Sequence, residues 1–393
     1  MSKAVYVCGA SRSPIGKFGG GLASLMPAEL SIPVARAAID RSGARLEDVD
    51  ETIWGHGRQA GGGTNTARQV SIGAGIPKEA PAYTVNKACG SSLFAIVQAA
   101  RTIRLDEAEV VLVGGVESMS NTPYLLPRAR WGYRMGHAEV IDGMYRDGFQ
   151  CPISGQLMGM TAENLADLYS IDRDEQDAHA VWSQQRAAQA WDEGAFAAEL
   201  VPIEVAGRKG SVTVSQDEHL RPGTTVEKLA RLPAIFKEGG SVHAGNSSGV
   251  TDGSAALVVA SEAAVERLGL RPMARVTGWS IAGVAPELMG IGPVNATRGL
   301  LDQLGLELSA FDLVELNEAF AAQLIACDRE LKFDRERLNV HGGAIALGHP
   351  IGATGARIAV TLLHAMARRD VRRGMATLCI SGGMGLSVAF ERD

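Results

Sequence analysis

The sequence lacks most of the features that would assign it to a specialised class of protein. Its 5 cysteines are odd in number and widely spaced, with no C-x-x-C pair, which argues against a disulfide framework and a zinc site. No apolar run reaches the roughly 18 residues needed to span a bilayer, and the N-terminal residues lack a signal-peptide core. We therefore expect a cytoplasmic protein with no metal site and no membrane contact.

An excess of charge of one sign is also missing. The net charge of −6 gives no reason to expect nucleic acid or an anionic membrane surface as a partner. Apolar residues make up 46% of the 393 residues and charged residues 21%, which is typical of a globular chain. At roughly 150 residues per domain, this length allows two or three domains. Any anionic ligand must meet locally placed basic side chains.

The first part of the chain alternates short apolar segments with helical periodicity. Strands are expected at 4–8, 52–54, 82–85 and 109–113, and helices at 27–41, 66–74 and after Cys89. The unbroken apolar run at 109–113 is typical of a strand buried on both faces of a largely parallel sheet. This alternation predicts an α/β fold with right-handed crossovers.

From about residue 118 to residue 249 the alternation stops, which indicates an insertion. Two amphipathic helices are expected there, at 161–169 and 174–193, with Asp172 as the N-cap of the second. The basic, aromatic loop at 127–134 is either a solvated surface or a contact to another subunit or to phosphate. Regular alternation returns with an apolar run at 255–259.

The remaining residues repeat the order of the first part. Strands are expected at 274–277, 312–315, 338–340, 376–379 and 386–390, and helices at 294–304, 320–329 and 352–368. We therefore expect two similar βαβαβαββ halves, with the insertion in only the first. The predicted division is residues 1–118 with 250–270, an inserted segment at 119–249, and residues 271–393.

A single cysteine, Cys89, stands where a buried helix is expected to begin. The N–H groups of a helix N-terminus lower the pKa of a thiol from its usual value of roughly 8.5, so Cys89 is a candidate nucleophile. A buried, inert cysteine is the alternative. His349 lies in a glycine-rich loop and Cys379 ends a strand, so a thiol with two acid/base partners is predicted.

Each of these partners also has a simpler interpretation. His349, between glycine and proline, could merely shape a turn, and Cys379 could be an ordinary core residue. Asn317, at the end of an expected strand, could cap the following helix. However, ligands of α/β sheets bind at the carboxyl ends of strands, which is where these three residues are expected to lie.

Several long motifs, in the same order along the whole chain, resemble those of one family. They are Asn86–Ser92, Glu117–Tyr124, Ala244–Gly249, Asn317–Gln323, Gly342–Pro350 and the strand that ends at Cys379. The sequence resembles the thiolases, most closely the biosynthetic acetyl-CoA acetyltransferases. The resemblance implies a layered αβαβα sandwich of duplicated halves with an inserted loop domain.

The resemblance also implies an activity. The reaction would be the reversible Claisen condensation of two acetyl-CoA molecules to acetoacetyl-CoA and CoA, ping-pong and without a cofactor. The coenzyme A thioesters are then substrates. The arginine-rich loop resembles one that forms tetramers in this family, which implies a homotetramer, a dimer of dimers.

Particular residues take roles from this resemblance. Cys89 would carry the acyl group, His349 would take its proton, and Cys379 would remove a proton from the second acetyl-CoA. The enolate oxygen would be bound by His349 and by a water that Asn317 holds. Backbone N–H groups of Cys89 and near Ser381 would form a second oxyanion hole. The implied contacts to coenzyme A and the acyl group are Arg221, Ser248, Phe236, Met158, Met289 and Phe320, of which the methionines could equally be core filler.

The sequence departs from the family pattern at two of these positions. Ser381 stands where glycine is common, and a positive φ would strain a serine. Leu157 stands where related biosynthetic enzymes often carry histidine, which is expected to change the selection of acyl groups.

Four other functions stay open at this point. A degradative 3-ketoacyl-CoA thiolase would accept longer chains, and a ketoacyl synthase would need no Cys379 base. A cysteine hydrolase could use Cys89, His349 and Asn317 as a triad. A duplicated scaffold could bind acyl-CoA without turnover.

Overall fold

One mixed sheet organises the computed structural model, which describes residues 3–207 and 210–392. Its strands are β1 (Val5–Arg12), β2 (Gly16–Lys17), β3 (Glu51–His56), β4 (Ala82–Val85), β5 (Val110–Ser118), β10 (Thr251–Ser261), β11 (Ala274–Gly283), β12 (Leu313–Leu316), β13 (Arg373–Ile380) and β14 (Met384–Glu391). Their order is β12-β13-β14-β11-β1-β10-β5-β3-β4, and β2 pairs with β10.

The strand order confirms the duplication. Read from the centre outward, β1-β10-β5-β3-β4 in the first half corresponds to β11-β14-β13-β12 in the second. A parallel bridge between Leu338 and Val314 occupies the place that β4 has in the first half. The halves join where β1 and β11 pair at Tyr6–Arg275 and Val7–Ala274.

Two expectations about the sheet are wrong. It is not largely parallel: β3–β4, β3–β5 and β12–β13 are parallel pairs, and the others are antiparallel. The three residues that join β13 to β14 can only form a hairpin, because a parallel connection needs a long crossover. The expected strand at 338–340 forms only the single bridge, because the Asn339 side chain bonds both the N–H and the C=O of Leu316, each at 2.9 Å.

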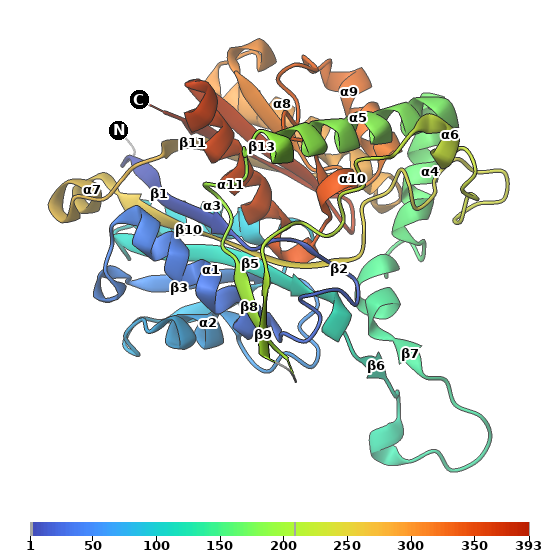
Figure 1. Cartoon of the computed structure of the whole chain (residues 1–393), viewed down its shortest axis with the longest axis horizontal. Coiled ribbons are helices and arrows are strands. Elements are labelled where there is room, and N and C mark those ends of the chain that lie inside the picture. Colours follow the sequence, from blue (N-terminus) through green and yellow to red (C-terminus); the bar gives the residue numbers. More distant parts are fainter. Residues whose placement is uncertain (1–2, 208–209, 393) are drawn as a thin grey trace.

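Helices complete five layers (Figure 1). The helices α1 (Pro27–Ser42) and α2 (Thr66–Ala74) cover the outer face of the first half, and α8 (Gly292–Leu304) and α9 (Ala321–Leu331) cover that of the second. Between the halves lie α3 (Ser91–Arg104) and α11 (Ile351–Arg369). The expected αβαβα sandwich is therefore confirmed.

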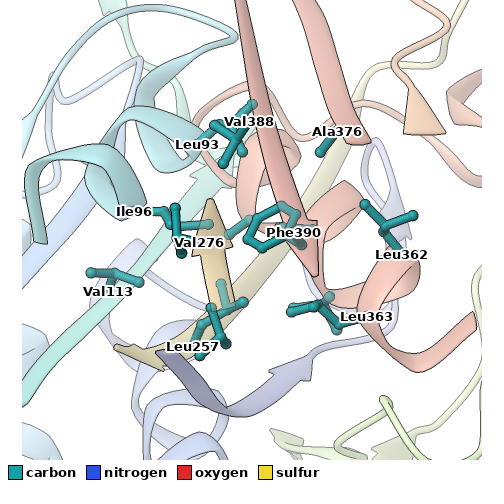
Figure 2. Close-up of a cluster of buried hydrophobic side chains, with 14 of the residues drawn as sticks. Leu93, Ile96, Val113, Leu257, Val276, Leu362, Leu363, Ala376, Val388 and Phe390 are labelled. Atoms are coloured by element: carbon teal, nitrogen blue, oxygen red, sulfur yellow. The ribbon is translucent and has the colours of Figure 1, made fainter. Parts of the chain in front are cut away.

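The central core consists of aliphatic side chains from both halves (Figure 2). Side chains of α3 and α11 pack against strands of each half, and the labelled members are Leu93, Ile96, Val113, Leu257, Val276, Leu362, Leu363, Ala376, Val388 and Phe390. Burial of each large side chain contributes about 1.5–3 kcal/mol. A Cβ at Gly355 of α11 would overlap the backbone nitrogen of Leu93, so glycine is required where the two helices meet. This packing fixes both helix N-termini, which carry the candidate site.

The inserted segment contains helices and two hairpins. The helices are α4 (Met158–Tyr169), α5 (Arg173–Asp192) and α6 (Val226–Leu229), and the hairpins are β6 (Tyr124–Leu125) with β7 (Ile141–Asp142) and β8 (Ile203–Gly207) with β9 (Gly210–Val214). Asp172 caps α5 as predicted, because its carboxylate accepts from the Glu175 N–H at 2.8 Å. The β6–β7 hairpin projects from the body of the molecule (Figure 1).

The remaining α-helices are short. Helix α7 (Glu262–Leu268) follows β10, and helix α10 (Ala344–Leu347) precedes the His349 loop.

The division of the chain into residues 1–118 with 250–270, an inserted segment at 119–249 and residues 271–393 stays a prediction. Across residues 3–207 and 210–392, no helix combines the length and the apolar character that a membrane crossing requires.

Candidate active site

A cavity of about 620 Å³ lies where the two halves and the inserted segment meet. The first half contributes the loops at 57–58 and 86–89, and the second contributes 319–320, His349 and Ser381. The inserted segment closes it with residues 145–149 and 157–159. Most of these residues follow the carboxyl ends of strands or precede a helix, as expected for a ligand site of an α/β sheet.

The loop that carries Cys89 is held by its own polar side chains. Asn86 donates to the C=O of Gly57 at 2.8 Å and accepts from the N–H of Ala88 at 3.1 Å. The Ser91 hydroxyl accepts from Lys87 N–H at 2.8 Å and donates to the C=O of Ala88 at 2.7 Å. Ala88 has a φ of 45°, a left-handed conformation that is unusual for a residue with a Cβ. The motif thus fixes a tight turn just before Cys89.

Cys89 lies at the cavity wall, 8% exposed, and is a protonated thiol at rest. Burial raises its pKa, and this outweighs the N–H groups of Ser381 and of Cys89 itself and the positive charge of Arg58. The expectation of a lowered pKa is therefore wrong. The physical reason is that α3 begins only at Ser91, so the sulfur lies before the helix, and burial is the larger effect.

His349 lies on the same wall, 6% exposed, and its tautomer can be inferred from its partner. The Thr354 hydroxyl donates to the C=O of Pro350 at 3.0 Å, so it accepts from His349 Nδ1–H at 2.6 Å. Nε2 is then the nitrogen left to act as a base. Burial, with the charges of Arg357 and Arg58, lowers the pKa of His349 to about 3, so the imidazole is neutral.

Cys379 is fully buried at 0% exposure and does not belong to the described cavity lining. It is the last residue but one of β13 and lies in an apolar cluster with Met289 and Phe320, which do line the cavity. Burial raises its pKa well above the usual value, and the nearby thiol of Cys89 adds to this shift. It is thus placed directly behind the wall, within electrostatic reach of Cys89, and its role as a base stays a prediction.

Asn317 follows β12 and is also fully buried outside the described lining. Its side-chain oxygen and nitrogen have no hydrogen-bond partner within the described ranges 3–207 and 210–392. The neighbouring Glu318 does have partners: it accepts from Ser183 at 2.7 Å, Asn339 at 3.1 Å and the Ile345 N–H at 3.2 Å. The loop is therefore anchored by Glu318, which leaves the Asn317 amide available.

All six residues predicted to contact coenzyme A or the acyl group line the cavity: Arg221, Ser248, Phe236, Met158, Met289 and Phe320. The rings of Phe236 and Phe320 meet edge to face with centroids 6.3 Å apart. Leu157 also lines the cavity, at the start of α4. The structure therefore brings these residues together with Cys89 and His349.

Ser381 also lines the cavity, without the strain that was anticipated. Positive φ values fall on the next two residues, Gly382 at 89° and Gly383 at 87°, and Ser381 is not among the described residues with positive φ. Its N–H and that of Cys89 itself lie close enough to the Cys89 sulfur to lower the pKa of the thiol. Their role as an oxyanion hole for a bound carbonyl stays a prediction.

Sequence reasoning missed Arg58 and Glu117. The buried Glu117 carboxylate accepts from the N–H groups of Gly57 at 3.2 Å, Arg58 at 3.0 Å and Gly352 at 2.9 Å, so it ties the ends of β3 and β5 to the start of α11. Burial alone would raise the pKa of Glu117, but His56 and Arg58 lower it. The only available signal was position, because Arg58 lies in the loop that follows the expected strand at 52–54.

The arrangement is suited to acyl transfer. A thiol, a neutral imidazole and two backbone N–H donors share one cavity with a long apolar wall. Within residues 3–207 and 210–392, no three His, Cys, Asp or Glu side chains are grouped so as to hold a metal ion.

Comparisons with known proteins cover nearly the whole chain. Residues 5–263 match the family described as "Thiolase, N-terminal domain", and residues 270–392 match "Thiolase, C-terminal domain". The chain is 50% identical over 390 residues to an acetyl-CoA acetyltransferase of Pseudomonas aeruginosa, covering 99% of each chain.

Solved structures are also similar to this chain over nearly its whole length. The Bacillus anthracis acetyl-CoA acetyltransferase superposes with a TM-score of 0.97 at 46% identity, covering 99% of each chain. The human mitochondrial 3-ketoacyl-CoA thiolase in complex with CoA superposes with a TM-score of 0.96 at 43% identity, covering 100% of this chain and 98% of that one.

Proposed function

The chain belongs to the thiolase family of acyltransferases, and on this premise we propose that it is an acetyl-CoA C-acetyltransferase. It would condense two acetyl-CoA molecules reversibly to acetoacetyl-CoA and CoA. The observation that carries the proposal is that Cys89 and His349 line the same cavity, with the backbone N–H groups of Cys89 and Ser381 close enough to the Cys89 sulfur to lower its pKa. The relatives named above as acetyl-CoA acetyltransferases support the choice of substrate.

In the first half-reaction the Cys89 sulfur attacks the thioester carbonyl. Its proton passes to Nε2 of His349, whose Nδ1–H stays bonded to Thr354. The N–H groups of Cys89 and Ser381 stabilise the oxyanion, and loss of one such donor typically costs about 10²–10³ in rate. Coenzyme A leaves as a thiol with the proton from His349, and the acetyl group stays on Cys89.

In the second half-reaction Cys379 acts as the base. A thiolate with a raised pKa is a stronger base, which suits the weak acidity of a thioester methyl group. Cys379 must first give up its own proton, and His349 Nε2 is the base available to take it. The resulting Nε2–H then donates to the enolate oxygen, together with a water held by the unpaired amide of Asn317.

The carbanion attacks the acetyl group on Cys89, which forms the new carbon–carbon bond. Cys89 leaves as a thiolate and recovers a proton from His349. The cycle moves only protons and acyl groups, and all three side chains return to their starting states. We therefore propose no redox or metal cofactor.

The test separates the two cysteines. Incubation with acetyl-CoA alone should add one acetyl group to the Cys89 peptide, read by mass, in the native protein and in Cys379→Ser. Cys89→Ala should show no acetylation, and both variants should fail to cleave acetoacetyl-CoA. Acetoacetyl-CoA synthesis that survives in Cys379→Ser would instead favour ketoacyl-synthase chemistry, and binding without acetylation would favour a non-catalytic scaffold.

A degradative 3-ketoacyl-CoA thiolase is the second candidate. The likeness to the human mitochondrial 3-ketoacyl-CoA thiolase supports it, and so does the apolar wall formed by Met158, Met289 and Phe236. Thiolysis of 3-ketoacyl-CoAs from four to sixteen carbons decides between the two. A steep preference for four carbons supports the acetyltransferase, and a flat profile supports the degradative enzyme.

We also propose that the protein is a homotetramer. It would lie in the cytoplasm and have no nucleic acid partner. Support comes from the loop between β6 and β7, where Trp131 is 83% exposed and Met135 96% exposed. Light scattering should give the mass of four chains for the native protein. The double variant Trp131→Ser and Met135→Ser should give a lower mass.

A further inference from the structure

Arg58 is a buried cation on the cavity wall that no step of the proposed reaction uses. It is 5% exposed, and none of its three guanidinium nitrogens has a hydrogen-bond partner in the part of the chain described, 3–207 and 210–392. Its Cζ lies 4.7 Å from the centre of the Phe149 ring. A buried charge that has lost its water and gained no acceptor is unfavourable unless a ligand supplies the acceptor.

The nearby acid does not neutralise this charge directly. Glu117 feels the field of Arg58, but its oxygens are occupied by backbone N–H groups, and no ion pair within 4.0 Å joins the two side chains in the described residues. Contacts place Arg58 near the reacting groups: Asn86 of the Cys89 loop bonds the C=O of the adjacent Gly57, and Glu117 accepts from the N–H groups of both Arg58 and Gly352, three residues after His349. The charge of Arg58 also acts on Cys89 and His349. It therefore faces the acyl end of the cavity, whereas the phosphates of coenzyme A are separated from the thioester by the pantetheine arm.

The cavity wall is shaped to hold the guanidinium. A Cβ at Gly148 would overlap the Nη2, Cζ and Nε atoms of Arg58, and Gly148 is not among the glycines whose positive φ demands glycine. Glycine at 148 therefore leaves room for the flat guanidinium, beside the Phe149 ring. Both residues belong to a single π-helical turn, Tyr145–Phe149, a form frequent at functional sites.

We propose that Arg58 binds a carboxylate at the far end of the acyl group, so that among acyl chains longer than acetoacetyl the protein selects 3-oxoacyl-CoA thioesters of dicarboxylic acids over methyl-ended ones of equal length. A planar guanidinium binds a carboxylate through two parallel hydrogen bonds, which the unpaired nitrogens can supply. This inference rests on the proposed thiolase function and specifies its substrate class.

The reaction on such a substrate is thiolysis. The Cys89 sulfur attacks the 3-oxo carbon and gives its proton to His349, and the bond between carbons 2 and 3 breaks. The carbanion at carbon 2 takes a proton from Cys379 and leaves as acetyl-CoA, and the proton held by His349 restores the Cys379 thiol. The remaining acyl chain, with its carboxylate on Arg58, stays on Cys89 until the thiol of coenzyme A takes it and releases the Cys89 thiol.

The experiment compares two probes of equal length, 3-oxohexanoyl-CoA and 3-oxohexanedioyl-CoA, which differ only in a terminal methyl or carboxylate group. The quantity measured is the ratio of kcat/KM for the dicarboxylic probe to that for the methyl probe. The native protein should show a ratio above one. Arg58→Leu should lower this ratio by about 10- to 150-fold, the value of a charge-assisted hydrogen bond.

A ratio separates recognition of the carboxylate from any general effect of Arg58 on Cys89, because such an effect is common to both probes. Gly148→Ala, which displaces the guanidinium, should lower the ratio in the same direction if Arg58→Leu does not fold. Arg221→Leu is the matched control, because Arg221 is an exposed cation of the same cavity. It should change kcat/KM for both probes equally.

Two results would overturn the proposal. A native ratio at or below one, with acetoacetyl-CoA still cleaved, refutes the role of Arg58 and leaves the thiolase function intact, as does an unchanged ratio in both Arg58→Leu and Gly148→Ala. No cleavage of acetoacetyl-CoA or of either probe refutes the proposed function itself.

Discussion

Replacing Thr354 by valine tests whether the His349 tautomer is set by a single hydroxyl. Thr354 is fully buried in α11 and does not belong to the described cavity lining, so the change leaves the substrate contacts in place. Valine has nearly the same shape but cannot accept from Nδ1–H, which the Thr354 oxygen does at 2.6 Å. The Nδ1–H group is then buried without an acceptor, or the proton moves to Nε2 and removes the base.

The size of the effect follows from the charge on the ring. In the resting state His349 is neutral, and its bond to Thr354 is worth about 0.5–1.5 kcal/mol. When Nε2 has accepted a proton the ring is cationic, and the same bond becomes charge-assisted, worth about 1.5–3 kcal/mol. Because Thr354→Val loses the bond in the resting state as well, kcat falls by the difference of about 1–1.5 kcal/mol, which is about 5- to 13-fold. KM changes little, because Thr354 acts through His349.

Steady-state thiolysis of acetoacetyl-CoA gives both constants for the native protein, Thr354→Val and Thr354→Ser. Serine keeps the hydroxyl and should restore most of kcat, whereas a purely steric role would not be rescued in this way. A kcat of Thr354→Val equal to the native value would refute the reasoning. An equal loss in the serine variant would also refute it.

Three further predictions concern the resting thiol and the stability of the fold. Alkylation of the Cys89 peptide by iodoacetamide should rise with pH and reach its midpoint above the ordinary thiol pKa of roughly 8.5, because only the thiolate reacts and burial raises the pKa. Asp217→Asn should lower the free energy of unfolding by about 3–5 kcal/mol in urea titrations, because it leaves the buried Arg12 guanidinium, 2.7 Å away, without that counter-charge. Gly355→Ala should cost about 1–3 kcal/mol or more in the same titration, because the new methyl group overlaps the backbone of Leu93.

Two exposed substitutions of the same chemical type serve as controls for the stability predictions. Asp167→Asn breaks an exposed pair with Lys237 and should cost no more than about 1 kcal/mol. Gly223→Ala meets only the flexible end of Lys228 at 3.4 Å and should be close to neutral. Costs equal to those of Asp217→Asn and Gly355→Ala would contradict the role assigned to burial. An alkylation midpoint below roughly 8.5, the ordinary thiol pKa, would contradict the inference that burial dominates at Cys89.

The sequence predicted the positions of helices and strands better than it predicted whether neighbouring strands are parallel or antiparallel. Periodicity alone located the helices at 27–41 and 66–74, because each buries one face against a sheet. The antiparallel arrangement depends on connections between strands, and the three-residue link from Ile380 to Met384 could have indicated a hairpin. The failure at 338–340 had no local signal, because it depends on where the Asn339 side chain meets Leu316 across space.

The candidate site was also predicted only in part. Cys89 and His349 were found because each lies in a distinctive local motif that prepares a turn before a helix. The direction of the pKa shift of Cys89 was not predicted correctly, since it depends on burial that only the packed halves create. Arg58 was missed because an arginine is usually solvated, and nothing nearby in the sequence shows that this one is enclosed without an acceptor.

The duplication explains why both reactive groups begin as neutral species. Cys89 precedes α3 and His349 precedes α11, the equivalent helices of the two halves, so the site forms only where the halves close on each other. That closure removes water from both groups, which raises the pKa of the thiol and lowers that of the imidazole. A thiolate and an imidazolium are therefore unfavourable in this cavity. In the proposed reaction they would form only as a thioester carbonyl takes up negative charge beside the N–H groups of Cys89 and Ser381, so proton transfer and attack on the substrate would occur together.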